Sequence, residues 1–170
     1  TGDLSFPIGI TLDSSGNIYI ADSWNHCIRK YNPAKALLDT FGKTPIGTPG
    51  RENGSLYYPV SVAIDDYCGY LFITEPHYER IKIFDLNGNY IYQWALPDRP
   101  VGAEGLSGVA TDNKTNVYIS GSVKGVPFLD RYIFKYRING LYTTPVPYIK
   151  NESPPNDSTD NFRDTAVTFD

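Results

Sequence analysis

Ile8-Gly9-Ile10-Thr11-Leu12-Asp13 is the stretch of sequence that decides the fold, because variants of it recur three more times along the chain. The other copies are Val60-Ser61-Val62-Ala63-Ile64-Asp65, Ser107-Gly108-Val109-Ala110-Thr111-Asp112 and Thr165-Ala166-Val167-Thr168-Phe169-Asp170. Successive copies are 52, 47 and 58 residues apart. A unit repeated at this spacing is typical of an array of similar modules or of a propeller. The repeat therefore predicts the architecture before any single residue is considered.

Each unit is predicted to fold as a four-stranded antiparallel meander, because its apolar residues alternate with small or polar ones at the period of a half-buried strand. The strands expected in the first unit are 7–12, 17–22, 27–31 and 36–41. Those expected in the second unit are 59–64, 70–75, 80–84 and 90–94, and those in the third are 107–112, 116–120, 131–136 and 140–143. The pairs Asn87-Gly88 and Asn139-Gly140 favour hairpin turns before the fourth strands, since Asn and Gly tolerate positive φ angles.

A small residue recurs at one position of the first strand in every unit. These residues are Gly9, Ser61, Gly108 and Ala166. A small side chain at the same place in each copy indicates that neighbouring backbones approach closely there, as the innermost strands do around a propeller axis.

The first unit resembles an NHL repeat in the stretches 6–13 and 16–29, including the pair Asn25-His26. The second unit keeps Pro59 and Glu75 of the pattern, and the third unit has Gly121 where an acid is expected. The resemblance weakens toward the C-terminus but covers nearly the whole chain. It implies a β-propeller of the NHL class, a fold that serves as a protein-binding platform, an RNA reader or occasionally an enzyme.

The fold class predicted is therefore all-β, a partial propeller of three four-stranded blades and the first strand of a fourth. The expected boundaries are 6–42 for blade 1, 58–95 for blade 2, 106–145 for blade 3, 146–163 for a loop and 164–170 for the start of blade 4. Propellers have about four to eight blades, and an incomplete ring leaves two open sheet faces. We expect the remaining blades to come from the same polypeptide, of which this chain would be a segment, or from an adjacent subunit.

The charge of the chain disfavours nucleic acid as a partner. Its 15 basic and 19 acidic side chains give a net charge of -4, and no run of Lys or Arg could form a phosphate-neutralising stripe. The sequence also holds no stretch of 18 consecutive apolar residues, so no membrane insertion is expected.

Acidic residues close the first strand of every unit, which raises the question of a calcium site. These residues are Asp13, Asp65, Asp112 and Asp170. Calcium needs about six to eight converging oxygens, and the spacing brings no four acids to one point. We predict instead that each Asp accepts hydrogen bonds from the backbone of its own turn, and that Asp22 and Glu75 do the same.

Catalysis finds little support in the sequence. The two histidines, His26 and His77, occupy different positions of the repeat, and a zinc site wants three or four N or S ligands. His26 is predicted to have a structural role and His77 to lie in an exposed loop. No catalytic, cofactor-binding or metal-binding residue is predicted, and calcium or zinc would be expected only if the protein were a propeller enzyme.

The cysteines and the glycosylation sequons point to different cellular compartments. Cys27 and Cys68 are predicted to lie at opposite ends of their blades, roughly 15 to 20 Å apart and beyond the reach of a disulfide. Against these unpaired cysteines stand four Asn-X-Ser/Thr sequons in predicted loops, at Asn53, Asn113, Asn151 and Asn156. The sequons favour an extracellular or cell-surface glycoprotein, and a cytoplasmic protein is the alternative.

The loops that follow the second and fourth strands gather at one end of a propeller and supply a candidate interaction face. Its predicted residues are Trp24, His77, Tyr78, Tyr57, Phe128 and Tyr148. Aromatic side chains on exposed loops often anchor protein interfaces, and the alternative is that Tyr57, Tyr58 and Tyr148 pack the loops onto the blades.

The function predicted is a non-catalytic scaffold that binds protein or glycan within a larger NHL-repeat protein. One alternative is a propeller enzyme of the lactonase or amidating-lyase type with a metal in the central channel. A second is an RNA-binding NHL domain, which the acidic charge disfavours.

Overall fold

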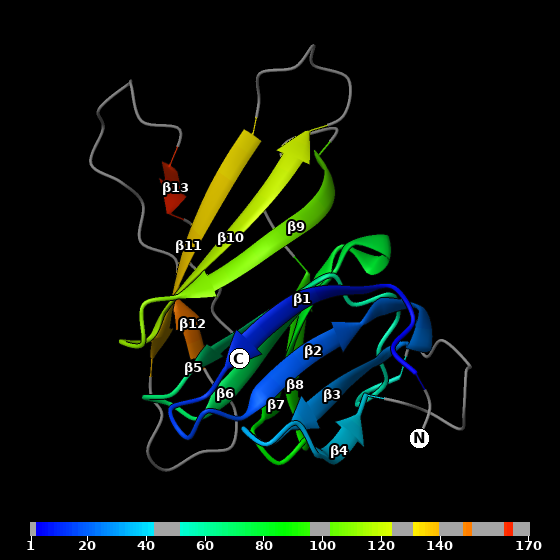
Figure 1. Ribbon diagram of the computed structural model, residues 1–170. Helices are drawn as coiled ribbons and strands as arrows, with labels where there is room; N and C mark the ends of the chain where they lie inside the picture. Colours follow the sequence, from blue (N-terminus) through cyan, green and yellow to red (C-terminus); the bar gives the residue numbers. More distant parts are fainter. Residues whose placement is uncertain are drawn as a thin grey trace.

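The computed structural model describes residues 3–42, 52–95, 103–123, 131–139, 148–150 and 162–164. Over these residues the chain folds into three sheets, antiparallel except for one short strand of the third, which we call blades 1, 2 and 3 in chain order (Figure 1). Among the described residues, no helix is long and apolar enough to cross a bilayer.

Blade 1 has the predicted meander topology. Its strands are β1 (Pro7–Leu12), β2 (Ile18–Asp22), β3 (Cys27–Tyr31) and β4 (Leu37–Phe41), paired in that order. A single 3₁₀ turn, η1 (Ser23–Asn25), joins β2 to β3 where the sequence predicts a loop.

Blade 2 repeats this arrangement with strands close to those expected. They are β5 (Ser61–Asp65), β6 (Tyr70–Glu75), β7 (Arg80–Asp85) and β8 (Tyr90–Ala95), and η2 (Pro76–Tyr78) joins β6 to β7. The two 3₁₀ turns therefore lie at equivalent places in the repeat.

Blade 3 departs from the expected pattern at its outer edge. Its main strands are β9 (Ala103–Thr111), β10 (Asn116–Val123) and β11 (Arg131–Asn139). Beside β11 lie β12 (Tyr148–Lys150), antiparallel to it, and β13 (Phe162–Asp164), parallel to it. The predicted fourth strand at 140–143 and residues 165–170 of the predicted fourth blade lie outside the described residues. The stretch 146–163, predicted as a loop, contains β12 and most of β13.

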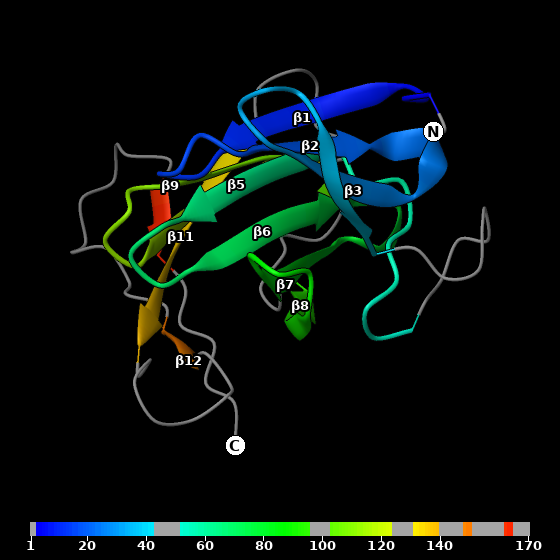
Figure 2. The same cartoon turned by 60° about the horizontal axis from the view of Figure 1, so that its bottom comes forward.

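Two apolar cores fill the spaces between successive blades. The core between blades 1 and 2 includes Tyr19, Ile28 and Phe41 from one side and Val62 and Ile64 from the other. The second core joins blades 2 and 3 around a shared aromatic contact, in which the rings of Trp94 and Tyr136 lie 5.7 Å apart. β1 and β5 lie side by side at the first interface, as Figure 2 shows from a second direction.

The acids at the ends of the first strands cap their own turns, as the sequence predicts. Asp13 accepts hydrogen bonds from the backbone N–H groups of Ser15 and Asn17 at 3.0 and 2.8 Å. Asp112 accepts the equivalent pair of backbone bonds, and Asp65 accepts from the N–H groups of Tyr67 and Cys68 in its own turn. Asp65 also accepts a bond from the N–H of Thr115 at 3.0 Å, which ties blade 2 to blade 3. The prediction for Asp170 lies outside the described residues.

The inner strands approach closely at Gly9, as the run of small residues predicts. A Cβ atom at Gly9 would lie 2.7 Å from the carbonyl oxygen of Val60 and 2.9 Å from the Cα of Ser61. At the equivalent Gly108, the one neighbour within 4 Å among the described residues is the hydroxyl oxygen of Ser120, at 2.9 Å. At Gly9 the neighbouring backbone leaves no room for a side chain, whereas at Gly108 the obstacle is a side-chain hydroxyl that can rotate.

Gly9→Ala is therefore expected to destabilise the protein by about 1–3 kcal/mol, the usual cost of overpacking a tight interface. Gly108→Ala is the matched control and should cost less, because the hydroxyl of Ser120 can rotate away at the cost of the hydrogen bond that it accepts from the N–H of Gly108, whereas backbone cannot give way. The urea midpoint of unfolding measures both variants. Equal losses for the two would contradict a backbone contact specific to the first interface.

Candidate functional site

A buried acid at the end of the second strand fixes the chain segment that enters each of the first two blades. In blade 1, the carboxylate of Asp22 accepts a hydrogen bond from the N–H of Ser5 at 2.7 Å. In blade 2, Glu75 at the equivalent position accepts from the N–H of Tyr57. Both acids are fully buried. The prediction that they cap their own turns is wrong about their backbone partner, because the amide that each binds belongs to the incoming segment.

A cation on the third strand completes this arrangement, which we call the entry clamp. In blade 1, Arg29 Nε lies 2.6 Å from Asp22 Oδ2, and the same guanidinium donates to the carbonyl of Asp3 at 3.2 Å. Burial alone would lower the pKa of Arg29, but the hydrogen bond and charge of Asp22 raise it above its ordinary value. The guanidinium is therefore charged wherever the protein is folded.

Blade 2 builds its entry clamp from different side chains. Arg80 Nε lies 2.5 Å from Glu75 Oε2, and Lys82 Nζ lies 3.9 Å from the same oxygen. Lys82 takes the place of Arg29 and donates to the carbonyls of Ser55 and, at 2.9 Å, Glu52. Burial lowers the pKa of Lys82 to about 8; the charge of Glu75 opposes this shift and the charge of Arg80 adds to it.

The third blade replaces the acid and the cation of the clamp together. The pairing of Gly121 with Tyr132 matches that of Asp22 with Cys27, so Gly121 stands where the acid would be. By the same register, Phe134 stands where Arg29 would be. A buried charge without its partner is strongly destabilising, which explains why neither member of the pair is kept alone.

The clamped segments pass through a left-handed backbone conformation directly after the clamped amide. Phe6 has φ 53° and Tyr58 has φ 44°, and the equivalent residue of blade 3 is Gly105 with φ 78°. Glycine adopts this conformation freely, whereas a bulky aromatic residue there is strained. Only the two clamped blades carry this strain, and both place an aromatic ring at the strained position.

His26 holds Tyr58, the second of these strained residues, in place. Its Nδ1 accepts a hydrogen bond from the N–H of Tyr58 at 3.0 Å, and its ring stacks on Tyr57 at 5.5 Å. Burial lowers the pKa of His26, which keeps the imidazole neutral with its proton on Nε2. The structure thus gives His26 the structural role that the sequence predicts.

The rings at the clamped end of blades 1 and 2 form a set that we call the aromatic surface. Its members are Phe6, Trp24, Tyr57, Tyr58, His77 and Tyr78. Phe6 and Trp24 stack at 5.3 Å and are 60% and 61% exposed. Tyr58 and His77 repeat this contact in blade 2 at 5.2 Å, and the ring of Tyr78 lies 4.7 Å from that of Tyr57.

The structure brings four of the six predicted interaction residues to this end of the molecule. Trp24 lies in η1, His77 and Tyr78 lie in η2, and Tyr57 lies in the segment that enters blade 2. Phe128 lies outside the described residues, and Tyr148 lies in β12.

Two members of the aromatic surface, Phe6 and Tyr58, were missed by sequence reasoning as interaction residues. The signal that could have found them is local, since each directly precedes a proline and the two stand 52 residues apart, one repeat unit.

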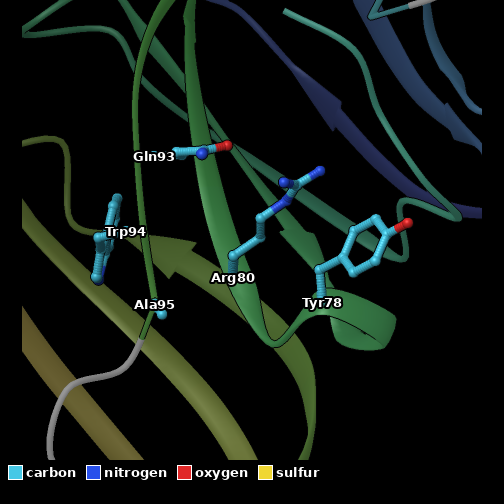
Figure 3. A pocket seen from close by; sticks show the side chains of 5 residues that line it. All are labelled: Tyr78, Arg80, Gln93, Trp94 and Ala95. Atoms are coloured by element: carbon cyan, nitrogen blue, oxygen red, sulfur yellow. The ribbon is translucent and has the colours of Figure 1, made fainter. Parts of the chain in front are cut away.

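An open pocket adjoins the aromatic surface at Tyr78. It has a volume of ≈ 500 Å³ and is lined by Tyr78, Arg80, Gln93, Trp94 and Ala95. Figure 3 shows Arg80 between Gln93 and Tyr78, and its guanidinium lies 4.6 Å from the centre of the Tyr78 ring. Among the described residues, Gln93 Oε1 and Trp94 Nε1 are buried without a hydrogen-bond partner, and the two side chains point to opposite sides of β8 (Figure 3).

The described residues hold no group of three or more His, Cys, Asp or Glu side chains that could bind a metal ion. Cys27 is buried and Cys68 is half-buried. Burial beside Asp65 raises the pKa of the Cys68 thiol to about 12. Of the four sequons, Asn53 and Asn113 are exposed, and Asn151 and Asn156 lie outside the described residues.

Comparison with known proteins places this geometry in the class of β-propellers. A chain of the nidogen/laminin complex is similar in structure, with a TM-score of 0.54 and 20% identity, covering 79% of this chain and 45% of that one. Within this class, the family model of the NHL repeat matches residues 4–31. The predicted resemblance to NHL-repeat propellers and the fold class of a partial propeller are thus confirmed.

Two curated proteins are similar in sequence to part of this chain. Protein SUPPRESSOR OF QUENCHING 1, chloroplastic, of Arabidopsis thaliana is 33% identical over 89 residues, which covers 49% of this chain and 8% of that protein. Peptidyl-glycine alpha-amidating monooxygenase A of Xenopus laevis is 31% identical over 90 residues, covering 52% and 9%. The match spans less than a tenth of the length of either relative.

Asp22→Ala is expected to destabilise the protein by roughly 3–5 kcal/mol, because it leaves Arg29 buried without its partner. The double variant Asp22→Gly with Arg29→Phe copies the residues of blade 3 and should cost less than Asp22→Ala alone. Urea unfolding of the wild type, Asp22→Gly, Arg29→Phe and the double variant forms the cycle that measures the coupling. Additive losses in that cycle would show that the clamp pair does not act as a unit.

The neutral state of His26 makes stability depend on pH. A histidine whose pKa is lower in the folded than in the unfolded state binds more protons when unfolded. The free energy of unfolding should therefore fall as the pH drops below about 6.5, the ordinary pKa of His. His26→Gln should flatten this dependence down to the range where carboxylates titrate, and unfolding at a series of pH values measures it. A curve unchanged by His26→Gln would refute the assignment.

Proposed function

We propose that this protein is a non-catalytic scaffold that binds a protein partner through the aromatic surface. The observation that carries the proposal is the Phe6–Trp24 stack, in which both rings are more than half exposed. Large aromatic rings of this kind dominate the binding energy of protein interfaces.

The aromatic surface is organised before any partner arrives. The entry clamps fix the backbone beneath Phe6 and Tyr58, and His26 holds the N–H of Tyr58. A surface ordered in advance loses less conformational entropy on binding, which favours affinity. Strained backbone that is kept in place by buried contacts is also characteristic of functional sites.

The pocket beside Tyr78 supplies polar contacts to the same partner. The Arg80 guanidinium lines the pocket and carries N–H donors. A peptide carbonyl accepts from such a donor, so we propose that main chain of the partner enters this pocket while its apolar side chains cover the rings.

A second part of the proposal concerns the rest of the ring and the location of the protein. We propose that further blades complete the ring and that the protein works outside the cell or at its surface. Exposed Asn53 and Asn113 are sterically open to glycosylation, which supports that location.

The test is affinity capture from an extract of the source cells by the immobilised protein, with bound proteins quantified by mass spectrometry. Trp24→Ala should reduce recovery of at least one protein about thirty-fold, because truncating a central aromatic residue costs 2 kcal/mol or more. Tyr67→Ala is the matched control, since Tyr67 is also 61% exposed but lies in the β5–β6 turn at the opposite end of its blade.

A partner lost equally from both variants, or from neither, would contradict binding through the aromatic surface. A glycan array run with the same variants separates the two ligand classes. Binding to a glycan that depends on Trp24, with no such protein, would overturn the choice of a protein partner.

A further inference from the structure

The face of blade 1 that points away from blade 2 is apolar and open. Along β1, Ile10 and Leu12 are 64% and 59% exposed. Ile18 and Ile20 on β2 and Tyr31 on β3 are only partly buried. Monomeric proteins seldom expose large aliphatic side chains in such a contiguous group.

The same positions of blade 2 are buried against blade 1. Val62 and Ile64, the counterparts of Ile10 and Leu12, are only 4% and 5% exposed. Leu71, Ile73 and Phe84 are the counterparts of Ile18, Ile20 and Tyr31 by strand register, and all three are buried in the same core. The open face of blade 1 therefore has the composition of an interface between blades.

The kind of surface that packs against such a face is also present within the chain. Blade 1 meets the buried face of blade 2 with Tyr19, Ala21 and Ile28, and blade 2 presents Phe72, Thr74 and Ile81 toward blade 3. Each set consists of an aromatic, a small and an isoleucine residue at equivalent places. A face that docks on Ile10 and Leu12 should repeat this set.

Blade 3 carries the same set on its outer face. Tyr118, Ser120 and Ile133 occupy the places of Tyr19, Ala21 and Ile28 by strand register. Ile133 is 41% exposed, whereas Ile28 and Ile81 are 0% exposed. The chain thus carries both halves of a blade interface, one at each end of its row of blades.

We infer that a second copy of this chain docks head to tail, with its Tyr118, Ser120 and Ile133 against Ile10 and Leu12 of the first. Two copies would then supply the six blades that their described residues form, within the roughly four to eight that close a propeller, and the fourth copy of the repeat at 165–170 lies outside those residues. A head-to-tail contact of this kind closes into a ring when the rotation returns to the first copy. The inference rests on the ring completion proposed above and names its source as this same chain.

Sedimentation velocity of the purified chain tests the inference over a range of concentrations. The wild type should be a dimer, and both Ile10→Asp with Leu12→Asp and Ile133→Asp alone should be monomers. These residues are exposed, so circular dichroism should show each variant folded. Tyr67→Asp is the control at an equally exposed site outside both faces and should stay dimeric.

Mixing the two monomeric variants gives the sharpest result. Each retains the face that the other has lost, so a one-to-one dimer should form, weaker than the wild type because only one of its two interfaces is intact. A wild-type monomer at every concentration would overturn the inference and point to a blade from another source. A dimer that survives the substitutions in blade 1, or variants that do not complement each other, would also overturn it. None of these three outcomes bears on the aromatic surface, which the capture experiment tests separately.

Discussion

The buried carboxylate at the end of the second strand in blades 1 and 2 is the interaction on which the aromatic surface depends. Asp22 and Glu75 bind the backbone N–H of the residue before the left-handed turn, and the adjoining cation binds a carbonyl of the same segment. An amide buried without this acceptor would cost roughly 1–3 kcal/mol. The clamp therefore fixes the path of the entering chain, and the path places the rings of Phe6 and Tyr58 where Trp24 and His77 meet them.

The third blade shows what accompanies the loss of this interaction. Gly121 and Phe134 replace the ion pair, and Gly105 replaces the aromatic residue at the left-handed position. Without a clamp to hold a strained conformation, glycine is the residue that adopts it at no steric cost. The acid, the cation and the strained aromatic ring thus occur together or not at all, which marks them as parts of one device rather than separate features of the repeat.

Local patterns were sufficient to predict the strands of the first two blades and the caps made by Asp13, Asp65 and Asp112, because the partners lie within a few residues. They were not sufficient for Asp22 and Glu75, whose amide partners lie 17 and 18 residues away on another segment. Trp24, Tyr57, His77 and Tyr78 were predicted from their place in loops. Phe6 and Tyr58 were not, since alternation in a strand does not reveal a left-handed turn just before it.

Hydrogen exchange of individual backbone amides, followed by NMR in the native protein, tests the entry clamp most directly. The account predicts that the amides of Ser5 and Tyr57 exchange as slowly as those of the central strands, although neither lies in a strand. If both amides exchanged at the rate of exposed loops, the carboxylates would not hold the entering segments. The claim that the entry clamps order the aromatic surface would then be contradicted.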